Sequence, residues 1–306
     1  AALAQSPLRL RLRELGWVEG DTVAFENAFG GGREDRLPEL ASRLVAKGVD
    51  VIWAMGPEAA VQTARATKSV PIIFWGVAYP VEQGLVDSLA RPARNVSGVA
   101  WFSSPEVDTK RLELLREIAP GAKRLAFLNV PTAARTVAGG AALPSPAVAP
   151  AAQKMGFEFR VFPVENADDF EAAFAAILAW GAQALTVAGT ALTVRERRRI
   201  VDFANQHRLP SAFTLRDFVE AGGLVSYAID WRPTLARSAE YVDRILRGAK
   251  PGELPVDLPS RYETALNLMT AKALGLTVPQ SIIIRADRVI ATPTDVTPHP
   301  ILPGRQ

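Results

Sequence analysis

The chain contains no cysteine in its 306 residues, and this absence excludes several kinds of protein chemistry at once. Disulfide frameworks, thiolate nucleophiles, iron–sulfur clusters and cysteine-based zinc sites all depend on that residue. Histidine is almost absent too, with two copies, His207 and His299. Neither belongs to a metal-binding spacing or stands near a serine nucleophile signature. We therefore expect that the protein is not an enzyme and binds no metal.

A long apolar run and an excess of one charge are also missing. No apolar stretch reaches the roughly 18 residues that a membrane-spanning helix needs. The 35 basic and 32 acidic residues nearly balance and are interspersed along the chain. Without a basic stripe there is no sign of a surface for nucleic acid or for anionic lipid. We expect a protein that does not span a membrane and whose ligand is a small molecule.

The glycine-rich segments lack the form of a nucleotide-binding loop. Gly30-Gly31-Gly32 is not followed by the Lys and Ser or Thr of a phosphate-binding loop. Gly222-Gly223 fits the turn between a helix and the next strand. The sequence therefore predicts no cofactor.

Short apolar runs alternate with amphipathic helical patterns along the whole chain. This alternation is typical of parallel sheets covered by helices, and the length suits two domains of about 150 residues each. Strands are expected at 22–29, 50–54, 70–75, 95–101, 124–129, 157–164, 183–188, 210–214, 224–227 and 262–267. Helices are expected at 8–15, 35–47, 57–67, 81–90, 105–118, 147–155, 168–180, 193–207, 215–221 and from Pro233 onward.

Several segments together resemble one protein family. They include LRELGWVEGDTV (12–23), DRLPELASRLVAKGVDVIWA (35–54), residues 70–100, KRLELLREIAPGAKRLAFL (110–128) and, above all, residues 209–276. Over most of its length the chain is similar to the substrate-binding proteins of one group of bacterial ABC importers, some of which bind tryptophan or tyrosine. The resemblance implies the type I periplasmic binding protein fold, with two Rossmann-like α/β lobes joined by a multi-crossover hinge. It also implies an ABC permease in the inner membrane as partner.

The chain is expected to cross between the lobes three times: near residues 101–104, near 227–231 and before 262. This predicts an N-terminal lobe of residues 1–102 plus 230–258 and a C-terminal lobe of residues 103–229 plus 259–306. Family members begin with a strand ahead of the first helix, and here that first strand of lobe 1 is missing. Residues 131–150, rich in Ala and Pro, are expected to form a long loop, with a lid over the site as the alternative.

The first five residues bear on localisation. Ala2 and Ala4 have the small-residue pattern of a secretory cleavage site, and the alternative is an ordinary alanine-rich helix start. Together with the resemblance, this predicts a periplasmic protein whose signal peptide has been removed.

Parallel α/β sheets bind ligands beyond the carboxyl ends of their strands, and the candidate site residues were chosen there. With Pro57 in the first helical turn, the backbone N–H groups from Glu58 onward would be free to bind a ligand carboxylate. The alternative is that this segment is an ordinary helix start without a ligand. Asp230 would pair with a ligand ammonium, unless it merely caps the next helix. The aromatic residues would wall an apolar group, unless they belong to the core. The candidates are Gly56, Pro57, Glu58, Tyr79, Trp101, Phe102, Ser103, Asn129, Thr132, Thr190, Phe213, Thr214, Tyr227 and Asp230.

The resemblance fails at one position of the expected site. The family commonly has Asp-Pro where this chain has Tyr79-Pro80. A charged site residue is thus replaced by an aromatic one, which predicts a larger, less cationic or more aromatic ligand. The predicted function is capture of an amino-acid-like molecule, with aromatic ones among the candidates, by hinge closure for an importer. The alternative is a ligand-sensing module of the same fold that serves a regulator or sensor.

Overall fold

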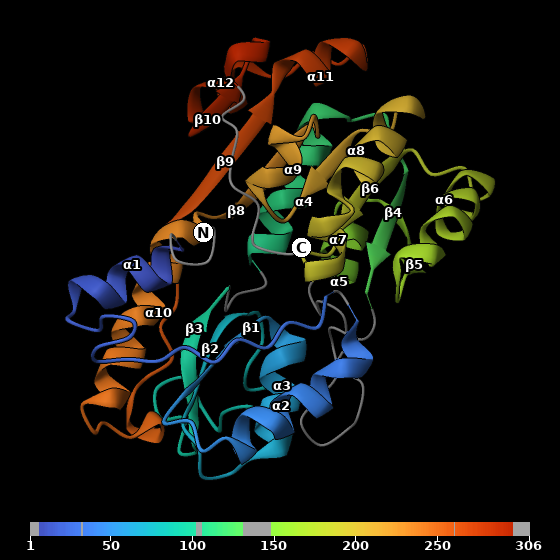
Figure 1. Ribbon diagram of the computed structural model, residues 1–306. Coiled ribbons are helices and arrows are strands. Elements are labelled where there is room, and N and C mark those ends of the chain that lie inside the picture. The colour runs from blue at the N-terminus through green and yellow to red at the C-terminus, as the bar shows by residue number, and fades with distance from the viewer. Residues whose placement is uncertain (1–5, 32, 102–105, 131–147, 260, 296–306) are drawn as a thin grey trace.

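The computed structural model describes residues 6–31, 33–101, 106–130, 148–259 and 261–295 of the chain. Two α/β lobes lie one below the other in Figure 1; the lower one is called lobe 1 and the upper one lobe 2. Lobe 1 is built on a sheet of three strands and lobe 2 on a sheet of seven. Within the described ranges, no helix is long and apolar enough to cross a membrane.

The lobe 1 sheet is parallel, and its strand order is β1-β2-β3. The strands are β1 (Ile52–Met55), β2 (Ile72–Val77) and β3 (Val96–Ala100). The central strand β2 is fully buried, as expected when helices cover both faces of a parallel sheet. Its side chains alternate between the two faces, so that Ile72 and Phe74 belong to one core cluster and Ile73 and Trp75 to the other.

Helices cover both faces of this sheet. On the face with Phe74, the second helix of one pair packs on the sheet and the first helix packs on the second. On the face with Trp75, both helices of another pair, which are far apart in the sequence, belong to the core cluster. The first pair is α2 (Leu37–Ala46), preceded by the short η1 (Glu34–Arg36), and α3 (Pro57–Ala66); the second is α1 (Pro7–Glu14) and α10 (Trp231–Leu246), which is followed by η4 (Pro251–Glu253).

Two elements predicted in lobe 1 are wrong. Residues 22–29 form no strand, and the only pairing described there is an isolated bridge between Glu19 and Val23. Residues 81–90 form successive turns instead of a helix, because Gly84 takes a left-handed conformation (φ 70°) and bonds back to Val81. Leu85 and Val86 are nevertheless buried, so the apolar spacing correctly predicted burial while the element type was wrong.

Among the strands that the structure describes, β1 is an edge strand of the lobe 1 sheet. The backbone N–H groups of Ile52 and Gly56 bond to Pro71 and Trp75, so alternate residues of β1 face β2. In a parallel strand, the intervening Trp53 and Met55 then direct their backbone groups away from β2. Among the described residues, no strand precedes β1.

The lobe 2 sheet has the strand order β10-β9-β8-β7-β6-β4-β5, and β9 is antiparallel to β8 while the other pairs are parallel. Its strands are β4 (Arg124–Asn129), β5 (Glu158–Pro163), β6 (Ala184–Val187), β7 (Ser211–Phe213), β8 (Val225–Ile229), β9 (Tyr262–Asn267) and β10 (Arg288–Ile290). The helical elements are α4 (Glu106–Ile118), α5 (Val148–Lys154), η3 (Ala167–Asp169), α6 (Phe170–Ala179), α7 (Ala191–Arg195), α8 (Arg197–Gln206), α9 (Arg216–Glu220), α11 (Leu268–Ala273), α12 (Gln280–Arg285) and η5 (Pro293–Asp295).

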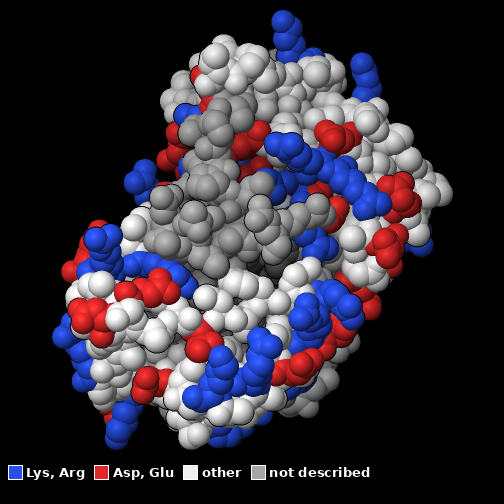
Figure 2. All heavy atoms as spheres, viewed as in Figure 1, with Lys and Arg blue, Asp and Glu red and all other residues white. Residues whose placement is uncertain are grey.

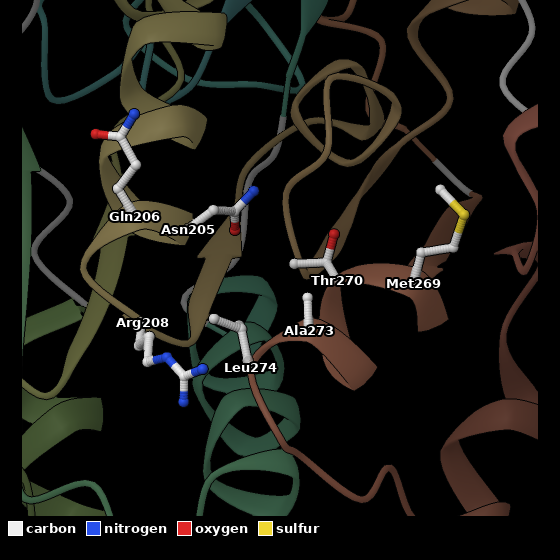
Figure 3. Close-up of a pocket in the computed structure, with 7 residues that line it drawn as sticks. All are labelled: Asn205, Gln206, Arg208, Met269, Thr270, Ala273 and Leu274. Carbon is white, nitrogen blue, oxygen red and sulfur yellow. The ribbon is translucent and has the colours of Figure 1, made fainter.

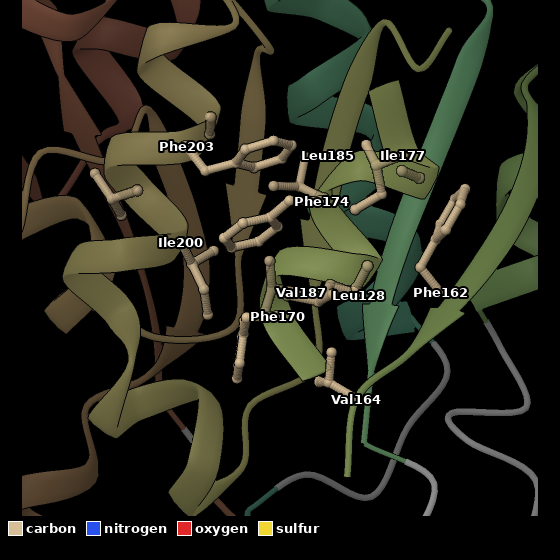
Figure 4. Close-up of a cluster of buried hydrophobic side chains, with 14 of the residues drawn as sticks. Leu128, Phe162, Val164, Phe170, Phe174, Ile177, Leu185, Val187, Ile200 and Phe203 are labelled. Carbon is tan, nitrogen blue, oxygen red and sulfur yellow. The ribbon is translucent and has the colours of Figure 1, made fainter. Parts of the chain in front are cut away.

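Aromatic residues fix the packing of α6 and α8 on the lobe 2 sheet (Figure 4). Phe174 of α6 and Phe203 of α8 stack with ring centroids 4.0 Å apart and planes 5° from parallel. Beneath them lie Leu128, Leu185 and Val187 of the sheet. The face with Phe127 instead packs on α4, α5 and α12, so this sheet too is covered on both sides.

Candidate functional site

The carboxyl ends of the lobe 1 strands and of the mutually parallel strands β4 to β8 of lobe 2 lie at the junction between the lobes. The end of β3 leads through Trp101 toward α4 of lobe 2, and the end of β8 leads through Asp230 into α10 of lobe 1. Because β4, β6 and β7 are parallel to β8, their carboxyl ends lie on the same side. Ligands of open α/β sheets bind at this end of the strands. The junction is therefore the candidate functional site.

Glu58 covers the start of α3 with its own carboxylate. Gly56 caps the helix with φ 85° and ψ 163°, a conformation that favours glycine, and Pro57 is the first helical residue. The half-buried Glu58 turns back over this start, since its Oε2 lies 3.2 Å from where a Cβ on Gly56 would be. The pKa of Glu58 is raised to about 7, chiefly by burial; the residue's own backbone N–H opposes the rise, and the charge of Glu34 adds to it. The expected binding position for a ligand carboxylate thus already holds an acidic group.

Four tryptophans form a cluster that links the lobes. Trp75 of β2 lies 5.7 Å from Trp101, 6.1 Å from Trp231 and 6.5 Å from Trp53, measured between ring centroids. Trp101 and Trp231 also pack against the core of lobe 2, and Trp231 Nε1 donates to Asp217 Oδ2 of α9 at 3.2 Å. The indole N–H of Trp101 is buried without a hydrogen-bond partner. This junction therefore holds a donor that a ligand could satisfy.

Lobe 2 contributes polar groups from neighbouring strand ends. Asn129 is buried at the end of β4. Thr214 follows β7, and its hydroxyl is buried without a partner. A Cβ on Gly189, just beyond β6, would collide with that hydroxyl, so the ends of β6 and β7 are in close contact.

Thr190 has a structural role in this conformation. Its hydroxyl accepts the N–H of Thr193 at 3.3 Å, and Thr193 Oγ1 accepts the N–H of Thr190 at 3.0 Å. This reciprocal pair is a capping box at the start of α7, and it occupies the hydroxyl that was expected to bind ligand.

We expect Thr190→Ala to lower the free energy of unfolding by about 1 kcal/mol, because it removes the N-cap hydroxyl of α7. Thr190→Ser keeps the hydroxyl and should retain wild-type stability in urea denaturation. A stable alanine variant with weakened ligand binding would instead show that Thr190 acts on the ligand.

Phe213, Tyr227 and Asp230 have different environments. Phe213 is fully buried and stacks on Phe218 with centroids 4.8 Å apart, so in this conformation it belongs to the lobe 2 core rather than to a pocket wall. Tyr227 is half-buried and stacks on Tyr262 at 5.7 Å. Asp230, at the crossover into α10, is close enough to Glu263 for its charge to raise the pKa of that carboxyl.

Sequence reasoning missed a charged network beside this crossover. Arg216 forms ion pairs with Glu263 at 3.0 Å and with Glu220 at 3.1 Å. Burial is the main cause that raises the pKa of both carboxyls. The i,i+4 spacing of Arg216 and Glu220 is a local signal that could have been used, whereas Glu263 comes from a distant strand.

Three candidates, Phe102, Ser103 and Thr132, lie outside the described residues, as does most of the predicted loop or lid at 131–150. The remaining candidates near the junction are Gly56, Pro57, Glu58 and Trp101 from lobe 1 and Asn129, Thr190 and Thr214 from lobe 2. Tyr79 is half-buried and lies just beyond the end of β2. The neighbouring strand in the sheet is β1, whose end leads to Glu58.

A cavity of about 380 Å³ lies elsewhere, between the end of α8 and α11 (Figure 3). Its lining includes Asn205, Arg208, Met269 and Leu274. Arg208 precedes β7 and α11 follows the antiparallel β9, so the cavity lies at the end of lobe 2 opposite to the junction. Basic and acidic side chains are interspersed over the molecular face seen in Figure 2.

Comparison with known proteins identifies relatives of the whole chain. A profile of the family described as ABC transporter substrate-binding protein matches residues 5–290. A curated tyrosine-binding protein from Clostridioides difficile is 27% identical over 265 residues, which are 87% of this chain and 74% of the relative.

Two solved structures share the fold. The first is an ABC domain in complex with L-Trp from Streptococcus pneumonia, with 24% identity, a TM-score of 0.82 and 93% of each chain covered. The second is a ligand-free, open substrate-binding protein with adhesive properties from Clostridium difficile, with 23% identity and a TM-score of 0.62 over 94% of this chain and 93% of that one. The predicted fold class of two α/β lobes in a type I periplasmic binding protein is thereby confirmed.

Proposed function

The chain belongs to the ABC transporter substrate-binding protein family, and from this premise we propose that it captures an amino-acid-like ligand at the junction between its lobes. The observation that carries the proposal is the convergence of strand ends from both sheets on a junction with unpartnered polar atoms, the Trp101 N–H and the Thr214 hydroxyl. In this role the protein works in the periplasm, hands its ligand to an ABC permease and makes no covalent change to it.

The aromatic surroundings favour a ligand with an aromatic side chain. The tryptophan cluster extends from Trp75 within β2 to Trp101, just beyond the carboxyl end of β3, and Tyr79 follows β2 in the sequence. Offset or edge-on aromatic pairs stabilise a bound ring by about 0.5–1.5 kcal/mol beyond the burial of its surface. The names of the relatives, a tyrosine-binding protein and an L-Trp complex, point to the same class.

Lobe closure is supported by the same two solved structures. Identity and coverage are nearly equal, yet the TM-score is 0.82 against the L-Trp complex and 0.62 against the ligand-free, open protein. The lobe arrangement described here is nearer to that of the ligand-bound relative. A ligand that contacts both lobes would stabilise this arrangement over an open one.

We expect L-tryptophan or L-tyrosine to bind at one site and L-leucine to bind far more weakly. At a ligand concentration one hundred times the Kd, the stabilisation should be about 2.7 kcal/mol, seen as a raised Tm. Calorimetry gives the stoichiometry, and small-angle scattering should show a smaller radius of gyration with ligand. Preference for small aliphatic amino acids, or binding without compaction, would contradict the proposal.

A further inference from the structure

Glu58 is an acidic group without a described counter-charge at the carboxyl end of β1. It is the second residue of α3, and no ion pair or side-chain hydrogen bond joins it to another described residue. The partial positive charge of a helix start normally favours an ionised carboxylate and lowers its pKa. Here burial outweighs that effect and holds the pKa at about 7. The carboxyl group therefore remains partly protonated near neutral pH.

The surroundings of Glu58 offer negative charge rather than a cation. The neighbouring strands β1 and β2 contain no charged residue. Glu34 is the charged group that shifts the Glu58 pKa, and it shifts it upward. Asp35 in the same turn is paired with Arg33 at 2.7 Å. The other charged residues of η1, α2 and α3 are Arg36, Glu39, Arg43 and Arg65.

A ligand carboxylate would meet electrostatic repulsion at this helix start, whereas a cation would satisfy a carboxylate that the protein leaves unpaired. Charge-assisted hydrogen bonds of this kind are about twice as strong as neutral ones. Tyr79 follows the adjacent strand β2, and an aromatic face there would add to the attraction for an ammonium group.

We propose that Glu58 receives the cationic amine of the bound ligand, so that the site selects amines over carboxylates that lack one. The inference rests on the proposed function and names its substrate class. It departs from the expectation of a less cationic ligand drawn from Tyr79, because in this proposal the charge absent at that position is supplied from the adjacent strand end.

Amine binding is then coupled to loss of a proton from Glu58. The free protein has a Glu58 pKa of about 7, and the bound cation lowers it, so ligand binds best where Glu58 is already ionised. The affinity for an amine approaches its maximum about one pH unit above this pKa and falls as the pH drops through it. For one group with this pKa, the affinity at pH 6 should be about tenfold weaker than at pH 8.

The test uses tryptamine and indole-3-propionate, which share a ring and chain length but carry an amine or a carboxylate. Calorimetry at pH 6, 7 and 8 should show tighter binding of tryptamine, an affinity that increases about tenfold over this range, and proton release at pH 7. Glu58→Gln should weaken tryptamine at pH 8 by at least about tenfold and abolish the pH dependence. Glu39→Gln, a change at an exposed position of α2, is the matched control. It should leave the tryptamine affinity at pH 8 and its pH dependence unchanged.

A stability measurement separates a ligand-binding role from a structural one. Because the folded-state pKa of Glu58 is raised, the ligand-free wild type loses stability as pH rises from about 4.5 toward 7. Ligand-free Glu58→Gln should therefore have a higher Tm than wild type at pH 8 and an equal one at pH 4, while binding the amine less well. A lower Tm at pH 8 would overturn the inference.

Other outcomes separate this inference from the proposed function. If indole-3-propionate binds more tightly than tryptamine, with an affinity that rises as pH falls, the inference is overturned while the proposed function stands. If L-tryptophan and both probes fail to bind the wild-type protein at millimolar concentration, both are overturned.

Discussion

Replacing Gly98 by alanine is expected to unfold lobe 1. Gly98 lies in β3 directly opposite Phe74 of β2. A Cβ at this position would lie 2.7 Å from Phe74 N and 2.8 Å from Phe74 Cγ, and closer still to the Phe74 carbonyl oxygen. Backbone atoms cannot move aside here, because the pairs Ile73–Ser97 and Trp75–Val99 hold both strands in register. The sheet has to separate to admit a single methyl group.

The expected loss in the free energy of unfolding is more than about 4 kcal/mol, which is beyond ordinary overpacking. Urea denaturation followed by circular dichroism measures it. Gly121→Ala is the matched control, since a Cβ there meets no atom within 4 Å, and its effect should stay within about 0.5 kcal/mol. A Gly98 variant that unfolds at the wild-type urea concentration would show that β2 and β3 are not packed as described.

The alternation of strand and helix patterns predicted most of the fold because each pattern follows from local burial. The run at 70–75 is apolar throughout and forms the fully buried β2, which begins at Ile72. Apolar and polar residues alternate over 22–29 as they would in a strand. A strand also needs a neighbouring strand to pair with, and the sequence pattern does not show whether one is available. At residues 81–90 the apolar spacing favoured a helix, but the positive φ of Gly84 prevents one, and the spacing of apolar residues does not reveal that conformation.

The candidate site was predictable in position but not in electrostatics. Strand ends can be located along the sequence, and Glu58 and Trp101 follow directly from that rule. The pKa of Glu58 depends on burial and on Glu34, which is 24 residues away in the sequence. Trp101 packs on Trp75 of β2, which in turn contacts Trp231 of α10, so the cluster could not be assembled without the fold.

Arg111→Met is expected to destabilise the protein nearly as strongly as the change at Gly98. Arg111 and Asp108 of α4 form an ion pair at 2.5 Å, and their side chains are 3% and 2% exposed. The guanidinium also reaches the Tyr227 carbonyl at 3.4 Å, close to where β8 leads into lobe 1. Removing one member of a buried ion pair costs about 3–5 kcal/mol, because the remaining charge stays in a low-dielectric environment.

The same helix provides the control. Lys110 and Glu113 form an ion pair with the same i,i+3 spacing at 3.0 Å, but their side chains are 36% and 44% exposed. Lys110→Met should cost less than about 1 kcal/mol, because water screens the exposed pair. The double variant Asp108→Leu/Arg111→Met leaves no buried charge behind and should be more stable than Arg111→Met alone. Additive losses in the double variant would mean that the two residues act independently. A recovered free energy of unfolding would show that the loss in Arg111→Met comes from the Asp108 carboxylate left buried without its partner.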